Sequence, residues 1–145
     1  METGFDTTDV LLLHRSGQAC VLPEGFACRY RGHQFRHRPG GVTDGMSSPQ
    51  FTHAVAGLEA YGWALPAAVI HDGGYHDELE IQAAGDWRPF TFSKDECDQL
   101  LKELLDVLAG EDKARQDLAL VIYEAVHLFG QPAFDAGRAA KGGAA

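Results

Sequence analysis

An ionisable pair, His71 and Asp72, directly follows an apolar stretch that predicts a buried helix. Two further acidic residues lie at equal distances along the chain: Asp44, 27 residues before His71 in a predicted loop, and Asp98, 27 residues after it. Imidazoles and carboxylates are costly to bury unless they pair with each other or with a metal ion. We therefore expect these groups to meet in the folded protein.

Asp98 is the acidic residue that is hardest to explain as ordinary surface. It lies three and seven residues before Leu101 and Leu105, beside the apolar stripe of its predicted helix. A carboxylate at the edge of a core needs a fixed donor, and an imidazole N–H is a common one. Both a structural salt bridge and a partner for His71 fit this position.

His71 and Asp72 are neighbours on a helix, so their side chains diverge by about 100° and cannot face one partner. A His71 that faces Asp98 suits a general base, and an Asp72 that faces the loop Asp44–Gly45 suits a metal ligand. Tyr75, one turn after His71, is placed to brace a neighbouring carboxylate with its hydroxyl group. Taken singly, these residues also fit a core histidine, an ion-paired aspartate and a packed tyrosine.

The expected donor set predicts calcium as the metal ion. The carboxylate of Asp72 and the carbonyl groups of a glycine-containing loop at Asp44 and Gly45 are hard oxygen ligands, which favour calcium over zinc. A zinc site would instead need further imidazoles beside His71. The candidates for that are His33, His37 and His53.

Length and charge restrict the class of protein. A chain of 145 residues, 45% of them apolar, is long enough for one globular domain with its own core. The net charge of −9 argues against nucleic acid as a partner, because clustered Lys and Arg bind phosphate. The segment 29–38 is locally basic and fits either a contact with an anionic surface or, more simply, a solvated pair of strands. Its basic residues are Arg29, Arg31, His33, Arg36, His37 and Arg38.

The sequence predicts neither export nor a membrane anchor. Cys20, Cys28 and Cys97 give an odd count without metal-site spacing, so we expect free thiols in a reducing compartment. The segment Met1–Asp9 is acidic and lacks the apolar core of a signal peptide. No stretch approaches the length of a membrane span. We expect the protein to act in the cytoplasm where it is made, or in a particle assembled there.

The pattern of elements predicts an α+β fold in a single domain over residues 1–135. Short strands are expected in a strand-rich part, 10–40, and a helical core of three helices in 42–130. The tail, 136–145, is small and Gly-rich, which predicts disorder.

The helices have recognisable ends. The first is expected over about 63–76. Ser93–Glu96 is a capping box that begins the second helix, and Gly110 ends it. The third helix, about 112–129, is expected to face the core with five apolar residues. These are Leu118, Val121, Ile122, Ala125 and Phe129.

Four elements in this order resemble the bacterial and fungal type of secreted phospholipase A2. They are Thr43–Pro49, His71–Tyr75, Asp98 and the ending Tyr123–Gly130 of the last predicted helix. The chain also resembles an uncharacterised family of small phage and prophage proteins. That family shares the Thr-Asp-Gly-x-Ser-x-Pro and Val-Ile-His-Asp signatures and a Pro-x-Gly-Phe element, which is Pro23–Phe26 here.

The resemblance implies a phospholipase A2-like helical core and a calcium-dependent hydrolase of a phospholipid or another ester. His71 would be the general base that takes a proton from attacking water. Asp98 would accept the other ring N–H and stabilise the imidazolium, and Tyr75 would brace Asp98. Asp72 would bind Ca²⁺ together with carbonyl groups of Asp44–Gly45. The phage resemblance implies an enzyme encoded by a phage, present in the host cytoplasm or packaged in a virion.

Three positions depart from the phospholipase pattern. Met46 stands where the secreted enzymes have a cysteine, Gly73 replaces an aromatic residue, and Ile70 replaces an arginine. These departures keep a second hypothesis open, a non-catalytic virion or phage assembly protein that retains the scaffold to dock virion proteins. The retained histidine and aspartates favour the enzyme, because an inert scaffold has no reason to keep ionisable groups in its core.

Overall fold

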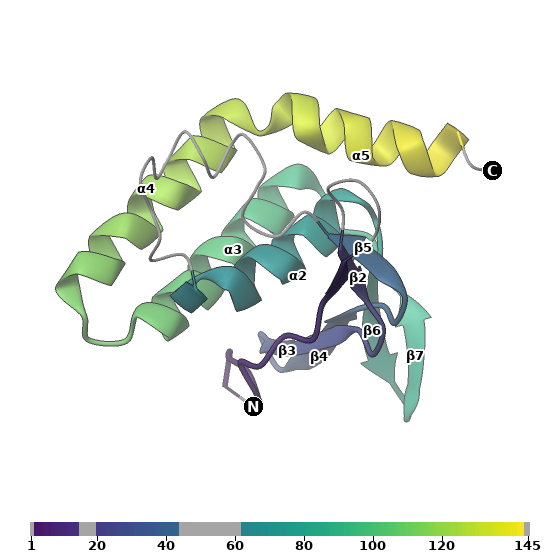
Figure 1. Cartoon of the computed structure of the whole chain (residues 1–145), viewed down its shortest axis with the longest axis horizontal. Helices are drawn as coiled ribbons and strands as arrows, with labels where there is room; N and C mark the ends of the chain where they lie inside the picture. The colour runs from purple at the N-terminus through teal and green to yellow at the C-terminus, as the bar shows by residue number, and fades with distance from the viewer. Residues whose placement is uncertain (1, 15–19, 44–61, 144–145) are drawn as a thin grey trace.

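The computed structural model describes residues 2–14, 20–43 and 62–143. They form an α+β fold in which helices pack on two small antiparallel sheets (Figure 1). Short strands precede the helices, as the sequence predicts. Asp44 and Gly45, the expected loop ligands of calcium, lie outside the described residues, as do Met46 and His53.

The strands form two separate sheets. The smaller has the order β1-β2-β5 and the larger the order β3-β4-β6-β7. The smaller sheet consists of β1 (Leu13–His14), β2 (Cys20–Leu22) and β5 (Gly41–Thr43). The larger consists of β3 (Phe26–Tyr30), β4 (His33–His37), β6 (Leu79–Ala83) and β7 (Asp86–Pro89). Strand β4 precedes the helix at Leu65–Tyr75 in the sequence, and β6 follows it. Because these two strands pair, one sheet holds the chain before and after that helix.

The first three described helices begin and end close to the expected signals, and a fourth follows them. They are α2 (Leu65–Tyr75), α3 (Lys94–Ala109), α4 (Lys113–Phe129) and α5 (Gln131–Gly143). The capping box of α3 is confirmed, since Ser93 and Glu96 each accept a hydrogen bond from the other's backbone N–H. Asp112 caps α4 by accepting from the N–H of Arg115. None of these helices is long and apolar enough to cross a membrane.

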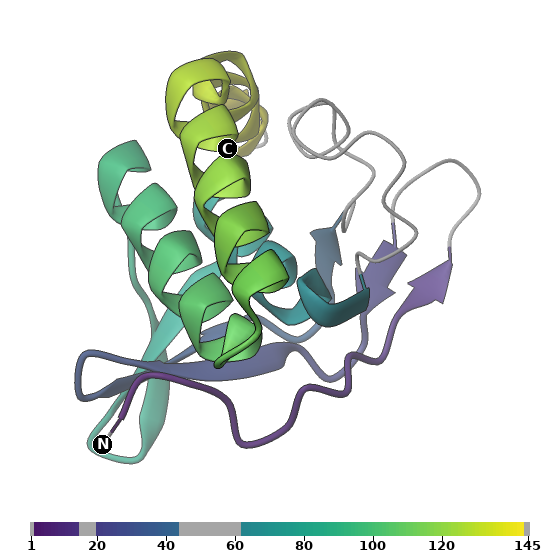
Figure 2. The ribbon, with the colours of Figure 1, turned by 90° about the vertical axis from the view of Figure 1, so that its left-hand side faces the viewer.

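Helix α2 is the centre of the molecule. It lies between the strands and the pair of helices α3 and α4, which stand side by side in Figure 2. All of its residues except Leu65 and Asp72 are buried. Helix α5 runs across the end of α2 at the top of Figure 1. A group on α2 can therefore reach a strand on one side and a helix on another.

Strands β6 and β7 lie inside the segment 42–130, which was expected to be a helical core without strands. The alternation of Leu79 and Ile81 with polar residues suits a strand beside β4. Ala84 and Gly85 connect the two strands with φ of +52° and +85°, the backbone of a tight two-residue hairpin turn. The hairpin extends the larger sheet before the chain enters α3.

The expectation of disorder after residue 135 is wrong for 136–143, which belong to α5. A Cβ at Gly137 would lie 2.6 Å from the carbonyl oxygen of Tyr75, so glycine lets α5 approach α2 closely. Arg138 donates hydrogen bonds to the carbonyl oxygens of Gly74 and Tyr75. These contacts explain why a Gly-rich composition gives a packed helix here.

The buried face of α4 differs in part from the expected one. Ala119, Ile122 and Val126 are buried, whereas Val121 and Phe129, both expected to face the core, are 44% and 69% exposed. Residues 118–122 are all apolar, so hydrophobic periodicity cannot select one face of this helix. Packing against α3 determines which face of α4 is buried.

Candidate active site

Helix α2 presents its His-Asp pair on two different sides. At about 100° per residue, His71 and Tyr75 share one side of the helix and Asp72 lies on another. Tyr75 donates a hydrogen bond to Asp98 of α3, and Gly73, next to Asp72, packs against β4. One side of α2 therefore faces α3 and the other faces the strands.

His71 and Asp98 meet in the core. Nε2 of His71 lies 2.9 Å from Oδ1 of Asp98, and their side chains are 4% and 0% exposed. Because a carboxylate accepts hydrogen bonds, Nε2 carries a proton in this contact, and Nδ1 is the ring nitrogen that can gain or lose the second proton. A histidine oriented in this way by a carboxylate is the arrangement of a general base.

Asp98 contacts polar side chains from three helices. The hydroxyl of Tyr75 donates to Oδ1 at 2.6 Å, the same oxygen that His71 uses. Nζ of Lys94 donates to Oδ2 at 2.6 Å, and Nδ1 of His127 lies 3.7 Å from that oxygen. One carboxylate oxygen therefore faces α2, and the other faces the start of α3 and the end of α4.

These contacts set the ionisation of the cluster. Burial raises the pKa of Asp98, but the hydrogen bond and charge of His71 lower it. The hydrogen bonds from Lys94 and Tyr75 act in the same direction, so the pKa of Asp98 lies below its usual value and the carboxylate is ionised at neutral pH. Burial and the bond to Asp98 raise the pKa of Tyr75 far above its usual value. Tyr75 therefore keeps its proton and remains a donor.

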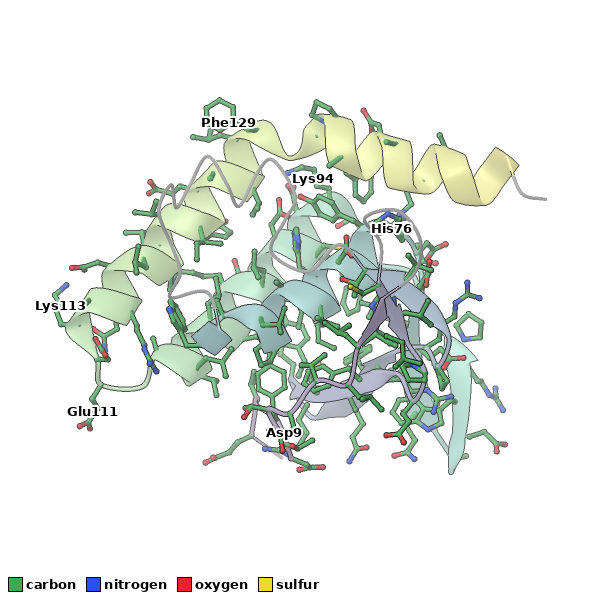
Figure 3. All side chains as sticks on the ribbon, in the orientation of Figure 1. Asp9, His76, Lys94, Glu111, Lys113 and Phe129 are labelled. Carbon is green, nitrogen blue, oxygen red and sulfur yellow. The ribbon has the colours of Figure 1, made fainter. Side chains whose placement is uncertain are left out.

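Lys94 connects this cluster to α4. Its Nζ also donates to the carbonyl oxygens of Val126 and His127, at 3.1 and 3.2 Å, and Figure 3 shows it beneath the junction of α4 and α5. The ammonium group thus has an acceptor for each of its three N–H bonds. Sequence analysis did not single out Lys94 or His127. The four-residue spacing from Lys94 to Asp98 is typical of an ion pair within one helix and could have indicated Lys94.

One glycine and two aromatic rings pack around the side chain of Tyr75. A Cβ at Gly130 would lie 2.6 Å from Oη of Tyr75, so the α4–α5 junction can close on it only with glycine there. The ring of Phe134 packs edge-on against the ring of Tyr75, with 5.3 Å between their centroids. The centroid of the His71 ring lies 4.1 Å from that of Tyr75. These contacts fix the rotamers of the two residues that bind Asp98.

Asp72 lies on a different side of α2 from His71 and Tyr75, apart from Asp98. Oδ1 of Asp72 is 3.3 Å from Nδ1 of His76, a residue that Figure 3 shows at the end of α2 below α5. The hydrogen bond to Asp72 outweighs burial and raises the pKa of His76 to about 9. Asp72 is one of the two partly exposed residues of α2. Its carboxylate can therefore reach an ion at the helix surface.

The described residues contain no group of three or more His, Cys, Asp or Glu side chains arranged to hold a metal ion. A calcium site rich in backbone carbonyls needs fewer such side chains, and Asp72 can supply one. Strand β5 packs against α2 and ends at Thr43, directly before Asp44. The chain therefore enters the predicted loop beside the helix that carries Asp72.

The basic segment 29–38 is neutralised by acidic side chains. Its ion pairs are Arg29 with Asp6, Arg31 with Glu103, Arg36 with Glu80 and Arg38 with Glu78. This arrangement favours the pair of solvated strands over a contact with an anionic surface. Both ring nitrogens of His37 contact other groups, Val69 and Glu78, so His37 is engaged away from the zinc site that was considered for it.

Comparison of the chain with protein-family models, with curated proteins and with solved structures finds no match. Function is therefore inferred from the side-chain contacts themselves. The structure brings His71, Tyr75 and Asp98 together and adds Lys94 to them. It places Asp72 on a separate side of the same helix.

Proposed function

We propose that the protein is a calcium-dependent ester hydrolase of phospholipase A2 type, in which His71 and Asp98 activate water. The observation that supports this most is the buried Asp98 carboxylate, whose Oδ1 accepts from both His71 and Tyr75. A purely structural carboxylate needs one cation, and Lys94 already provides it at Oδ2. The oriented imidazole is an addition that a salt bridge does not require.

The proposed chemistry is general-base catalysis. Nδ1 of His71 takes a proton from a water molecule while the water oxygen bonds to the carbonyl carbon of the ester. Asp98 stabilises the imidazolium through its Nε2–H. When the tetrahedral intermediate collapses, the bond from carbon to the alcohol oxygen breaks and the imidazolium protonates that oxygen. The products are a carboxylic acid and an alcohol, and His71 is neutral again.

The proposed calcium ligands are the carboxylate of Asp72 and the backbone carbonyl groups of Asp44 and Gly45. Calcium bound there supplies polarisation of the ester carbonyl and stabilisation of the oxyanion. Two observations support this assignment. Asp72 is partly exposed on a different side of α2 from His71, and β5, which packs against α2, ends at Thr43, directly before Asp44.

The proposed substrate is a phospholipid or another carboxylic ester, and the proposed source of the gene is a phage. The protein would act in the host cytoplasm or from a virion, with virion proteins rather than nucleic acid as its macromolecular partners. The net charge of −9 and the ion-paired arginines support the exclusion of nucleic acid. The free thiols of Cys20, Cys28 and Cys97 suit a reducing compartment.

A second candidate function is a non-catalytic virion or assembly protein with the same scaffold. The observation that favours it is the apolar outer surface of α4, where Leu120, Val121, Leu128 and Phe129 are exposed. Phe129 projects away from the body of the molecule in Figure 3. Exposed apolar side chains that gather on one helix suit contact with another protein.

Two measurements separate these candidates. We expect calorimetric titration to show calcium binding by the wild type and its loss in Asp72→Asn. We also expect the wild type to release fatty acid from phospholipid vesicles with calcium, and not with a chelator. No binding at millimolar calcium contradicts the metal-dependent mechanism. Binding without hydrolysis of phospholipid or other esters favours the assembly protein.

A further inference from the structure

A cavity of about 560 Å³ lies between the larger sheet and the helices α3 and α4. Its lining comes from β3, β4, the chain just before α3, the first two turns of α3 and the last two turns of α4. This volume is typical of sites that bind small molecules, which measure about 300–1,000 Å³. Neither His71 nor Asp98 lines the cavity, so the proposed hydrolysis leaves it without a role.

Three aromatic rings form the floor of the cavity. Tyr30, Phe35 and Phe92 are buried and line it, and the centroids of their rings lie 5.1 to 6.4 Å apart. The face of an aromatic ring carries the negative part of its quadrupole, which attracts a cation within about 6 Å. A floor of this kind suits a group that is both apolar and positively charged.

Two rings of α4 form a wall of the cavity. Tyr123 and His127, one helical turn apart, stack with 5.5 Å between centroids and 15° between their planes. Nδ1 of His127 lies 3.7 Å from Oδ2 of Asp98, and Nζ of Lys94 donates to the carbonyl oxygen of His127 at 3.2 Å. These contacts hold the wall in place, so the cavity is formed before any ligand binds.

Two carboxylates stand at the opening of the cavity. Asp95 and Glu96 of α3 are exposed and line it. Glu96 uses one oxygen to accept from the N–H of Ser93 in the capping box. Among the described residues, the carboxylate of Asp95 has no hydrogen-bond or ion-pair partner. The opening therefore presents negative charge that the fold has not neutralised.

Arg31 shows how these surroundings hold a cation. Its guanidinium carbon lies over the ring of Tyr30, 5.0 Å from the centroid, and its Nη2 donates to Oε2 of Glu103 at 2.7 Å. A ring face and a carboxylate thus bind a positive group of the protein itself. The side chain of Arg31 is 61% exposed, so it lies at the rim and leaves the cavity beside it open.

We propose that this cavity binds an organic ammonium group, with aromatic rings around its methyl groups and with Asp95 and Glu96 near its charge. A quaternary ammonium ion has no N–H to donate, so ring faces and nearby carboxylates recognise it. The two carboxylates disfavour an anion, and a neutral ligand gains nothing from them. A free organic cation and a lipid headgroup both carry this group. The site is separate from the proposed hydrolysis and does not depend on it.

The test compares choline, which carries a trimethylammonium group, with 3,3-dimethylbutan-1-ol, which has the same shape and no charge. Each is titrated into the full chain while NMR follows the ring signals of Tyr123 and His127. We expect saturable shifts of both rings with choline, and binding of the neutral alcohol that is at least about 5-fold weaker. Equal affinity for the two overturns the proposal in favour of a purely apolar pocket. No saturable shift at tens of millimolar choline overturns the site itself.

A substitution in the wall tests the aromatic contribution. Tyr123→Leu keeps an apolar side chain but removes the ring, and it should weaken choline binding about 2- to 30-fold. The His127 ring reports the binding. Phe129→Leu is the matched control, because Phe129 is an exposed aromatic residue of the same helix that does not line the cavity. Unchanged choline affinity in folded Tyr123→Leu contradicts the proposed recognition.

A substitution at the opening tests the charge. Asp95→Asn keeps the size of the side chain and should weaken choline binding about 2- to 5-fold at low salt, and less at high salt, because an exposed charge is screened. Glu111→Gln removes a charge at the other end of α3, far from Lys94 in Figure 3, and should leave the affinity unchanged. Because Asp95 is exposed, this variant decides the question if Tyr123→Leu does not fold. Equal affinity of Asp95→Asn and the wild type overturns the role of the carboxylates.

Vesicles distinguish the two sources of the ammonium group. Phosphatidylcholine vesicles are added to the choline complex with a calcium chelator present to prevent hydrolysis, and phosphatidylglycerol vesicles are the control. Displacement of choline by phosphatidylcholine alone identifies a lipid headgroup, and no displacement identifies a free organic cation. Both results support an ammonium site. Because choline binding needs neither calcium nor an ester, its outcome is independent of whether the protein releases fatty acid.

Discussion

Lys94 and Asp98 form a buried ion pair one helical turn apart on α3, with Nζ of Lys94 2.6 Å from Oδ2 of Asp98. Lys102 and Asp106 have the same spacing on the same helix, with a closest distance of 2.8 Å. The pairs differ in burial, since the side chain of Asp98 is 0% exposed and that of Asp106 is 49% exposed. The second pair is therefore a matched control for the first.

Replacing Lys94 with methionine should destabilise the protein strongly. The change leaves the buried Asp98 without its cation, which typically costs about 3–5 kcal/mol. Lys102→Met removes an exposed pair and should cost about 0–1 kcal/mol. The free energies of unfolding from urea titrations check this difference. Equal losses in the two variants would show that Asp98 does not depend on Lys94.

Tyr75→Phe should destabilise the fold by about 1.5–3 kcal/mol, because it removes a hydrogen bond to a buried charge. Tyr30→Phe is the comparison, since Tyr30 also donates to a carboxylate, that of Glu103. Arg31 still holds Glu103 near the surface, so that change should cost only about 0.5–1.5 kcal/mol. Urea unfolding of both variants measures the two losses. A smaller loss for Tyr75→Phe would contradict the buried network.

The depressed pKa of Asp98 makes stability sensitive to acid. A carboxyl group whose pKa is lower in the folded state than in the unfolded one stabilises the fold above its unfolded pKa, near 3.9. This contribution is lost as the pH falls through the folded pKa. Asp98→Asn should therefore be less stable than the wild type at neutral pH, and the difference should narrow below about pH 4. Unfolding curves over a pH series would refute this if the gap stayed constant.

Gly74→Ala should destabilise α2, although alanine normally favours a helix by about 0.5–1 kcal/mol. The added Cβ would lie 2.7 Å from Sγ of Cys97, and such overpacking costs about 1–3 kcal/mol. Adding Cys97→Ala should recover much of the loss. Gly62→Ala is the control, because its Cβ would meet no atom of the described residues within 4 Å. The midpoint temperatures of thermal unfolding check this order of stability. A Gly74→Ala variant as stable as the wild type would contradict the close contact of α2 with α3.

The capping box at Ser93 and the inward position of Asp98 could both be predicted from sequence, because they depend on local spacing along one helix. The partner of Asp98 could be proposed because a buried carboxylate requires a donor. Lys94 was not predicted, since a lysine in the first turn of a helix usually faces solvent. Its burial depends on the end of α4, which is distant in sequence.

The glycines show the other limit of sequence reasoning. Two adjacent glycines in a helix permit close neighbours, but only the fold identifies these as the His37 ring for Gly73 and Cys97 for Gly74. Gly137 contributed to a composition typical of disorder, and its real role is contact with Tyr75. These roles depend on tertiary approach of helices and strands, which no local pattern encodes.

The most direct test of the central claim compares fatty-acid release from phospholipid vesicles by the wild type, His71→Gln and His33→Gln in the presence of calcium. Glutamine at position 71 can still bond to Asp98 but cannot take a proton from water. We predict release by the wild type and by His33→Gln, and only background release by His71→Gln. Equal release by all three proteins, at or above background, would contradict a catalytic role for His71 and Asp98.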